Sequence, residues 1–366
     1  MNIQDPDSFS SLSFYQKEKL SAIEAKHEAQ KIAFGPMVFQ ATKALRDLKI
    51  LEVIDNSTDG LTLPEIVSVT QISAYGVRVL VEAGLGIGLL LWQSEKYVLT
   101  KTGFFILHDP MTRANMDFVN DINYQGFFHL TESIQEGKPI GLKHFGEQWS
   151  TIYQALSSLP LQAKESWFAF DHFYSDDSFS KVLPIVFSHT PSTLLDVGGN
   201  TGKWARQCID FNKEVQVTIA DLPQQIAMAK EETSQHPDKN RISFYPVNIL
   251  QPEATLPTGF DAIWMSQFLD CFSDEEITDI ATKAHKALKE DGTLFIMETF
   301  WDRQKYPTSA FCLQQTSLYF TCMANGNSQM YRSDIFIACI EKAGFTVVEQ
   351  TDNIGISHTL LQCKKK

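Results

Sequence analysis

The chain has 366 residues, a length that predicts two domains or one large one. Its formal net charge is −13 at pH 7, and because so acidic a surface repels phosphate backbones, the composition argues against nucleic-acid binding. No stretch approaches the roughly 18 consecutive apolar residues of a membrane-spanning helix, and the N-terminus lacks the basic and then apolar pattern of a secretory signal, so no membrane association is expected.

The N-terminal third is predicted to be helical and to end in a β-hairpin. Pro64 suits the first turn of a helix, Ser73 suits an N-cap, and Ser94–Glu95 separates two apolar runs at hairpin spacing. The expected elements are a helical stretch over residues 15–55, helices over Leu63–Val69 and from Ser73 to Gly84, and strands over Leu89–Gln93 and Lys96–Thr100. Helices followed by a hairpin are the order of a winged helix.

A winged helix raises the question of DNA binding. A DNA reader needs a basic stripe on its recognition helix, but Ala74–Gly84 carries one Arg and one Glu. Between Leu61 and Leu107 the acidic and basic residues also balance. The sequence therefore favours a protein contact, dimerisation above all, over nucleic acid.

The middle of the chain, residues 111–184, follows a helical pattern and is unusually aromatic, with an interruption at Gly137–Gly141. We expect this segment to be a helical linker that covers the active site of the domain that follows.

From Pro191 onward, short apolar runs alternate with helical patterns. The expected strands are Thr193–Val197, Val215–Ala220, Ile242–Val247, Asp261–Met265 and Thr293–Glu298, and the expected helices are Lys203–Phe211, Gln224–Glu232, Asp274–Lys289 and Asp334–Ala343. Such alternation predicts an α/β fold, a doubly wound and mostly parallel sheet with helices on both faces. The last two runs, Thr346–Gln350 and His358–Cys363, predict an antiparallel hairpin at the sheet edge.

A glycine-rich turn follows the first of these strands. Asp196–Gly202 reads Asp-Val-Gly-Gly-Asn-Thr-Gly, which lets the backbone approach a ligand at the start of a helix. The second strand ends at Asp221, an acidic residue placed to accept hydrogen bonds from ribose hydroxyls. The glycine spacing differs from the G-x-G-x-x-G of nicotinamide enzymes. A tight turn followed by an N-capping Asp is the purely structural alternative.

At these residues the sequence resembles the class I S-adenosylmethionine-dependent methyltransferases, and more narrowly the small-molecule O-methyltransferases of plant secondary metabolism and bacterial antibiotic pathways. The family signature Asp-Val-Gly-Gly-Gly-Thr-Gly matches Asp196–Gly202, with Asn200 in place of the third glycine. Asn tolerates left-handed backbone angles, so this departure is mild. The family's Asp-Leu-Pro is present as Asp221–Pro223, and Phe268–Glu276 resembles its Ile-Leu-His-Asp-Trp-Ser-Asp-Glu.

The resemblance implies a winged-helix-like dimerisation domain over residues 1–110, the helical linker over 111–184 and a cofactor-binding catalytic domain over 185–366. It further implies S-adenosylmethionine as cofactor, S-adenosylhomocysteine as product, no metal and a homodimer. The residues expected to bind the cofactor are Asp196, Gly198, Gly199, Asn200, Gly202, Asp221, Leu222, Asn248, Ile249, Ser266 and Gln267.

The catalytic positions depart from the family. Its general base, a His, is Asp270 here, and the next residue, an Asp that holds substrate, is Cys271. Glu298 matches an orienting acid, whereas a second such Glu would fall near Met330 and is missing. An ordinary Asp, with a pKa near ~3.9, is a poor base for a phenol, but burial raises that pKa. Asp270 is therefore either a weak base supported by Glu298 or a loop carboxylate without a catalytic role.

Aromatic and polar side chains are expected to form the acceptor pocket. The candidates are Phe170, Tyr174, Phe268, Cys271, Gln315 and Tyr319. Core packing explains the stripe at helical spacing that contains Gln315 and Tyr319 equally well. His129 and His172 are alternative bases, although a lone His is more often an ordinary surface or core residue.

These observations predict a methyltransferase that acts on an oxygen of an apolar, aromatic small molecule. The alternative is a family member that binds S-adenosylmethionine but no longer transfers its methyl group, because the base His is Asp270. A winged-helix DNA regulator is a third interpretation, and the charge argues against it. The 6 cysteines have no CxxC spacing, which favours reduced thiols and a cytoplasmic protein.

Overall fold

The computed structural model describes residues 11–175 and 178–366 and divides into two compact units. The helical unit comprises residues 17–122 and 165–170, and the sheet unit comprises residues 11–16, 123–164 and the described residues from 171 to 366. The domain boundaries expected at residues 110 and 184 stay predictions.

The helical unit consists of short helices and one hairpin. Its elements are α1 (Ala22–Ala33), α2 (Gly35–Asp47), α3 (Ile50–Asp55), α4 (Leu63–Thr70), α5 (Ala74–Ile87), β1 (Leu90–Gln93), β2 (Lys96–Leu99), α6 (Lys101–His108) and α7 (Pro110–Phe118). Capping boxes start α1 and α4, and the Ser73 hydroxyl accepts a hydrogen bond from Gly76 N at the start of α5. The stretch expected to be helical over residues 15–55 is divided: α1 begins only at Ala22, and Phe34 separates α1 from α2. A second break falls at Lys49 between α2 and α3, whose backbone is left-handed with φ 60°.

The hairpin confirms the predicted winged-helix order. Ser94 and Glu95 both have positive φ, 49° and 64°, which is the two-residue turn that matches the twist of antiparallel strands. Trp92 and Tyr97 lie directly opposite each other on β1 and β2, with ring centroids 4.7 Å apart. Such cross-strand aromatic pairs stabilise a hairpin.

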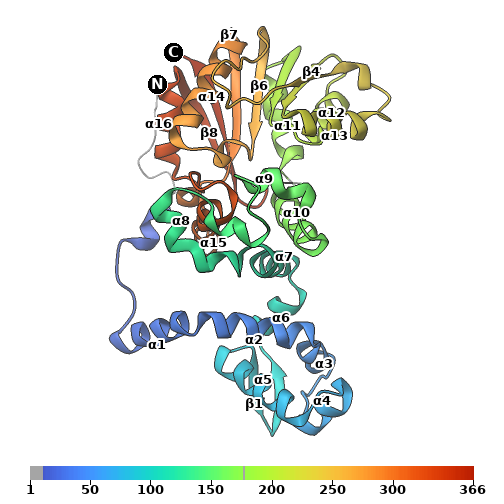
Figure 1. Cartoon of the computed structure of the whole chain (residues 1–366), viewed down its shortest axis with the longest axis vertical. Helices are drawn as coiled ribbons and strands as arrows, with labels where there is room; N and C mark the ends of the chain where they lie inside the picture. Colours follow the sequence, from blue (N-terminus) through green and yellow to red (C-terminus); the bar gives the residue numbers. More distant parts are fainter. Residues whose placement is uncertain (1–10, 176–177) are drawn as a thin grey trace. The chain divides into compact units, whose positions relative to one another are not determined.

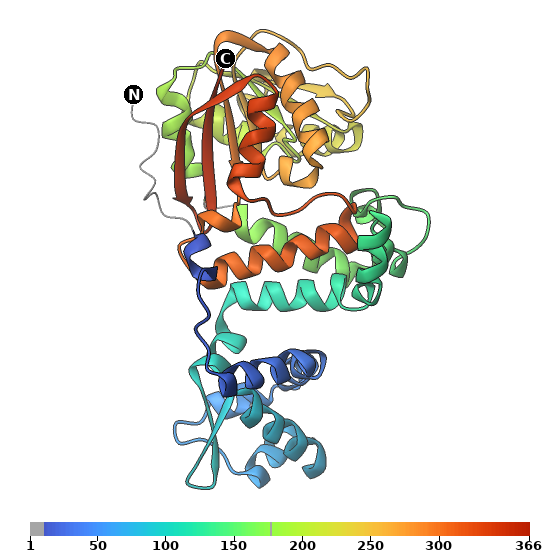
Figure 2. The same ribbon diagram turned by 90° about the vertical axis from the view of Figure 1, so that its left-hand side faces the viewer.

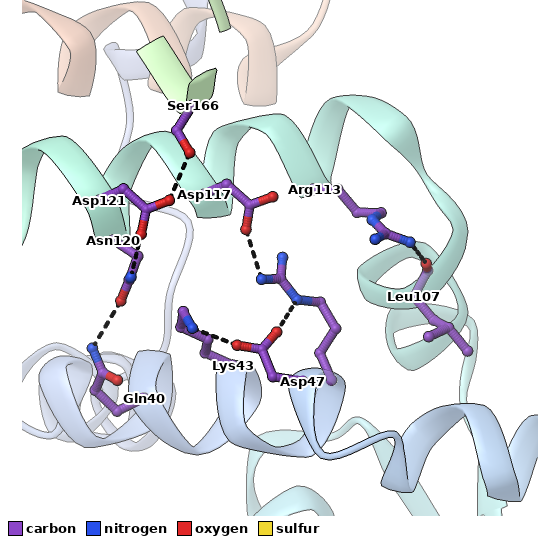
Figure 3. Close-up of polar contacts among 10 residues, drawn as sticks. Gln40, Lys43, Asp47, Leu107, Arg113, Asp117, Asn120, Asp121 and Ser166 are labelled. Carbon is purple, nitrogen blue, oxygen red and sulfur yellow. Dashed lines mark hydrogen bonds and ion pairs between the residues drawn. The ribbon is translucent and has the colours of Figure 1, made fainter. Parts of the chain in front are cut away.

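Polar contacts join α2 to α7 and its continuation inside the helical unit (Figure 3). Arg46 of α2 pairs with Asp117 of α7 at 2.6 Å and with Asp47 at 2.8 Å. Further along, Asp121 accepts a hydrogen bond of 2.6 Å from the Ser166 hydroxyl. Ser166 belongs to α10 (Leu161–Ser175), so the middle of this helix is fixed to the helical unit.

The sheet unit contains a seven-stranded sheet with the order β5-β4-β3-β6-β7-β9-β8 (Figure 1). The strands are β3 (Thr193–Val197), β4 (Gln216–Asp221), β5 (Ile242–Pro246), β6 (Phe260–Ser266), β7 (Leu288–Glu298), β8 (Phe345–Ile354) and β9 (His358–Lys365). The first five are parallel to one another, which confirms the predicted doubly wound α/β fold. β9 pairs antiparallel with both β7 and β8, so the predicted terminal hairpin is confirmed, with the two strands in dark red at one edge in Figure 2.

Helices cover both faces of this sheet. They are α11 (Phe179–Ser188), α12 (Lys203–Phe211), α13 (Pro223–Thr233), α14 (Asp274–Ala287) and α16 (Ser333–Lys342). The sheet unit also contains the helices α8 (Leu130–Glu136), α9 (Ile152–Ala155) and α15 (Pro307–Tyr319). One apolar core lies between the sheet and α14 and α16, and the other between the sheet and α11, α12 and α13. The predicted helix from Asp274 ends at Ala287, earlier than expected, because Leu288 already pairs with Phe260 of β6.

In the described part of the chain, no single helix has both the length and the apolar composition needed to cross a membrane. The pair α4 and α5 meets that test only when taken together, and it bends by 119° between the two helices.

Candidate active site

The site lies at the carboxyl ends of β3 and β6. β3 lies between β4 and β6, so the chain leaves β3 toward one side of the sheet and returns later on the other side. In open α/β sheets, ligands bind at the carboxyl ends of the strands where the strand order reverses in this way. The turn after β3 allows a ligand to approach its backbone closely. Gly198, Asn200 and Gly202 in this turn all have positive φ. A Cβ on Gly198 would lie 2.3 Å from the Phe268 ring, and one on Gly199 would lie 2.6 Å from Asp196 Oδ2.

Asp196 and Asp221 face this turn. Asp221 accepts hydrogen bonds from Asn200 N at 2.9 Å and Leu222 N at 2.7 Å. Burial raises the pKa of Asp221, while these two hydrogen bonds act in the opposite direction. Burial also raises the pKa of Asp196 well above its usual value, and the charge of Asp221 adds to this effect. The Oδ2 atom of Asp196 is buried and has no hydrogen-bond partner among the described residues.

The loop after β5 carries Asn248 and Ile249. This loop is held to the end of β4, because Val247 N donates a hydrogen bond to Asp221 O at 2.8 Å. Asn248 is exposed, and its Oδ1 accepts from Leu250 N at 3.2 Å, which orders the loop. The ammonium group of Lys283, on α14, also holds this loop, because its Nζ donates to Ile249 O at 2.6 Å and to Gln251 O at 3.2 Å.

The second half of the site follows β6. The Ser266 hydroxyl at its end is buried without a partner in the described part of the chain, and Gln267 turns the chain with φ 47°. Glu298, at the end of β7, then fixes the loop, because its Oε1 accepts from Phe268 N at 3.0 Å and Leu269 N at 2.9 Å. Burial and then the charge of Asp270 raise the pKa of Glu298 well above its usual value.

Asp270 lies in the turn η7 (Leu269–Cys271) and is 7% exposed. Burial raises its pKa to about 7; the hydrogen bond from the Cys271 thiol, 3.5 Å from Oδ1, opposes this rise, and the charge of Asp171 adds to it. A carboxyl with a pKa near neutrality is half-ionised where enzymes operate, as a general base requires.

The predicted pocket residues are only partly brought together. Phe268, Cys271 and the buried Tyr319 lie in the sheet unit, where the Phe268 ring packs on Phe272 with centroids 4.9 Å apart. Gln315 is exposed on α15. Phe170 belongs to the helical unit, where it stacks on Phe118 with centroids 4.0 Å apart.

Of the other histidine and tyrosine candidates, only His129 has a described side chain. The side chains of His172 and Tyr174 lie outside the described residues. His129 is partly exposed and pairs with Glu132 at 3.0 Å, one turn further along the chain. No contact places His129 near Asp270 in the described structure.

Sequence reasoning did not find three residues that the structure brings to the site. Tyr153 of α9 interacts with Cys271, Asn325 Nδ2 donates to Cys271 O at 2.6 Å, and Lys283 supports the Asn248 loop. The sequence could have indicated that Lys283 is buried, because it is a charged residue on the apolar stripe of α14 between Ile280 and Ala287. Tyr153 and Asn325 belong to no sequence motif of the site, because only the fold brings them to η7.

The residues of the turn fit a cationic nucleoside such as S-adenosylmethionine. The buried Asp196 Oδ2 can accept from an ammonium group, and the glycines leave room for a ligand against the start of α12. No group of three or more His, Cys, Asp or Glu side chains that would suit a metal ion occurs among residues 11–175 and 178–366.

Comparison with known families agrees with this geometry. The model of the Dimerisation2-like domain matches residues 26–97, and the model of the O-methyltransferase domain matches residues 127–346. The first match covers most of the winged-helix region, and the second includes the Asp196–Gly202 turn, Asp221, Asp270 and Glu298.

Two named relatives illustrate the range of the family. The chain is 23% identical over 317 residues to a protein named L-tyrosine C(3)-methyltransferase from Streptomyces lavendulae, with 86% of this chain and 85% of the relative covered. It is 19% identical over 283 residues to acetylserotonin O-methyltransferase from Homo sapiens, with 75% and 80% covered.

Solved structures show the same fold. The S-adenosylmethionine-dependent methyltransferase SibL in its apo form superposes with a TM-score of 0.70 at 22% identity, covering 92% of this chain and 98% of the other. Human N-acetylserotonin methyltransferase in complex with SAM gives 0.61 at 18% identity, covering 96% and 99%. The resemblance inferred from the motifs is thereby confirmed. Since the O-methyltransferase match spans more than half of its residues, the chain belongs to the O-methyltransferase domain family and is an S-adenosylmethionine-dependent methyltransferase.

Proposed function

We propose that this methyltransferase acts on a hydroxyl oxygen of an apolar, aromatic small molecule, and that Asp270 replaces the family's histidine as the general base. The observation that carries the proposal is the burial of Asp270 beside Glu298, which raises the Asp270 pKa to about 7. The same observation favours catalysis over a family member that only binds the cofactor, because strongly shifted pKa values cluster at functional sites.

The donor is assigned to the turn after β3. Asp196, Gly198, Gly199, Asn200 and Gly202 would surround its amino-acid and ribose parts. Asp221 and Leu222 would meet the ribose, and Asn248, Ile249, Ser266 and Gln267 would line the adenine side. When bound, S-adenosylmethionine supplies a methyl group whose bond to sulfur breaks as the new bond to the acceptor oxygen forms, leaving S-adenosylhomocysteine.

The residues of this chain provide the acceptor side. Asp270 takes the hydroxyl proton, and Glu298 holds the loop that presents Asp270 through its hydrogen bonds to Phe268 N and Leu269 N. A positioned base contributes roughly 10²–10⁴-fold to such a step. Phe268, Cys271 and Tyr319 supply apolar and weakly polar surface for the ring, and Phe170, Tyr174 and Gln315 are retained as candidates for its outer wall.

Methyl transfer to a ring carbon beside a phenol is a second candidate. The relative from Streptomyces lavendulae is named for transfer to C(3) of L-tyrosine, and the match covers 86% of this chain. Deprotonating the phenol also activates the adjacent carbon, so the same Asp270 would serve both reactions. The products differ, since only the O-methyl product loses its free hydroxyl.

A homodimer through the helical unit is the proposed assembly. The Dimerisation2-like match covers residues 26–97, and this unit exposes large apolar side chains on α1, α2 and α5, among them Ile32, Met37 and Tyr75. Light scattering on the eluted protein should give twice the chain mass of 41.4 kDa. Replacing both Ile32 and Met37 by Asp should shift that mass toward the monomer, and an unchanged mass would place the interface elsewhere.

The experiment that tests the function is a methyl-transfer screen on the purified full chain. The screen uses labelled S-adenosylmethionine and a panel of phenols, carboxylates and thiols, with product identity determined by mass spectrometry. O-methylated phenols are the expected products. If the protein binds S-adenosylmethionine but methylates only carboxylates or thiols, or no acceptor at all, the proposal is wrong.

A further inference from the structure

A buried tyrosine hydroxyl lies next to the predicted base. Tyr153 belongs to the short helix α9, between Ile152 and Ala155, neither of which has any exposed surface. Its hydroxyl oxygen is buried, has no oxygen or nitrogen partner among the described residues, and meets the thiol of Cys271. Buried hydroxyls almost always have a good partner, so a hydroxyl with only a thiol beside it needs an explanation.

The surroundings of this hydroxyl are those of the acceptor site. The ionisable groups that act on it include Cys271, Tyr319 and Asp270. Cys271 is the residue after Asp270, and its thiol already donates to Asp270 Oδ1 at 3.5 Å. The Cys271 sulfur is a weak acceptor for the Tyr153 hydroxyl, so an oxygen atom of a ligand would be a better partner for this donor.

The hydroxyl stays protonated. Burial raises the pKa of Tyr153 well above its usual value, and the neighbouring Cys271 adds to this rise. Tyr153 is therefore a fixed hydrogen-bond donor beside Asp270, and Asp270 is an acceptor for a substrate proton. One small molecule that engages both groups needs two adjacent polar atoms, one to give a proton and one to receive a hydrogen bond.

Building on the function proposed above, we propose that Tyr153 is a specificity-determining residue that donates a hydrogen bond to a second oxygen of the acceptor. The preferred substrates are then aromatic hydroxy compounds with a second oxygen next to the reacting hydroxyl. That oxygen lies on the neighbouring ring carbon in a vicinal diol, or on a carbonyl group attached to that carbon in an ortho-hydroxy carbonyl compound. A site built to hydrogen-bond a substrate group discriminates strongly against the analogue that lacks it, because the buried protein group is left unpaired.

The test compares two probes with the same skeleton, 2,3-dihydroxynaphthalene and 2-naphthol. Values of kcat/KM are measured for the wild type, for Tyr153→Phe and for the control Tyr306→Phe, which removes a hydroxyl from an exposed tyrosine at the start of α15. We expect the wild type to prefer the vicinal diol and Tyr153→Phe to lose about 10–100-fold on it alone, the effect of one lost hydrogen bond at a buried site. Tyr306→Phe should match the wild type on both probes.

The melting temperature separates this role from a structural one. Removing a hydroxyl whose protein contact is only with a weakly accepting thiol should leave the Tm of Tyr153→Phe nearly unchanged. A Tm several degrees below that of the wild type would reveal a structural hydrogen bond and overturn the proposal.

The kinetic comparison of the two probes can also overturn the proposed role of Tyr153. A wild type without preference for the vicinal diol, or a Tyr153→Phe variant that loses equally on both probes, overturns the role of Tyr153 and leaves the proposed O-methylation standing. If S-adenosylmethionine binds but no phenol is methylated, the proposed function fails and the role of Tyr153 fails with it.

Discussion

The two halves of the site are built from different parts of the chain. The donor half is a backbone structure, the turn Asp196–Gly202, whose φ values and amide groups are set by glycine and asparagine. The acceptor half consists of side chains, with Asp270 and Glu298 buried and Cys271 half-buried next to Asp270. The donor half keeps the family signature, whereas the acceptor half departs from it at the base. From this comparison we expect that binding the cofactor and choosing the reaction are separable properties of this fold.

The largest expected effect is on the acceptor half. Replacing Asp270 by Asn removes the base and should lower kcat by about 10²–10⁴-fold, while the affinity for S-adenosylmethionine stays the same. Steady-state kinetics and calorimetric titration measure the two quantities. Asp291→Asn, an exposed position, is the control. A loss of cofactor affinity equal to the loss of rate would mean that the two halves are not separable.

The same substitution should stabilise the protein at alkaline pH. Because the folded-state pKa of Asp270 is raised from 3.8 to about 7, the folded state binds a proton more tightly than the unfolded state. Stability from this group is therefore full below pH 4 and is lost as pH rises through 7. Asp270→Asn avoids that loss, on the order of 4 kcal/mol at pH 8. Thermal unfolding at pH 8 and pH 4 should show the gain at pH 8 alone.

Asp221 tests the donor half. Asp221→Ala removes the acceptor for Asn200 N and Leu222 N and the expected ribose contact, so the Kd for S-adenosylmethionine should rise about 100-fold. Titration with S-adenosylhomocysteine should show a similar loss, and Asp291→Ala should bind as the wild type does. Unchanged affinity in Asp221→Ala would remove Asp221 from the cofactor site.

Glu298 distinguishes positioning from charge. Glu298→Ala breaks two backbone hydrogen bonds that hold the Asp270 loop, and kcat should fall roughly 30-fold. Glu298→Gln keeps an oxygen acceptor at the same place, so it should retain most of the activity and the same pH profile. If Gln is as damaging as Ala, the charge of Glu298 is required and its role as a loop support is insufficient.

The smallest effect is expected at Lys283. Lys283→Met releases Ile249 O and Gln251 O, so the Asn248 loop loosens and the KM for S-adenosylmethionine should rise about 10-fold with kcat unchanged. Lys283→Arg, which keeps the donors, should recover part of the affinity. Lys286→Met, on the exposed face of the same helix, is the matched control. A fall in kcat with no change in KM would contradict this role.

The fold was largely predictable because its signals are local. Strand β3 and helix α12 have the predicted bounds, since an apolar run and a glycine turn determine both. Asn200, accepted in place of glycine, has the left-handed φ of 47° that the substitution required. Lys49 was missed as a helix break, because a lysine with positive φ carries no sequence signal.

The site was predictable only where motifs are contiguous. Asp196, Asp221 and Asp270 could be named from their motifs, but the pKa of Asp270 depends on burial and on Asp171, which is almost 100 residues away in the chain. Tyr153 and Asn325 reach η7 from loops and helices that share no pattern with it. Phe170 fits the aromatic pattern of a pocket wall, yet its stacking partner is Phe118 of the helical unit.

The pH dependence of methyl transfer tests the central claim, that Asp270 is the base, most directly. With a phenol acceptor, kcat/KM of the wild type should rise with pH and level off above about 7, the pKa to which burial raises Asp270. Asp270→Asn should be slower and should lack this rise. If Asp270→Asn keeps the same rate and the same pH profile as the wild type, Asp270 is not the base and the account of the acceptor half is wrong.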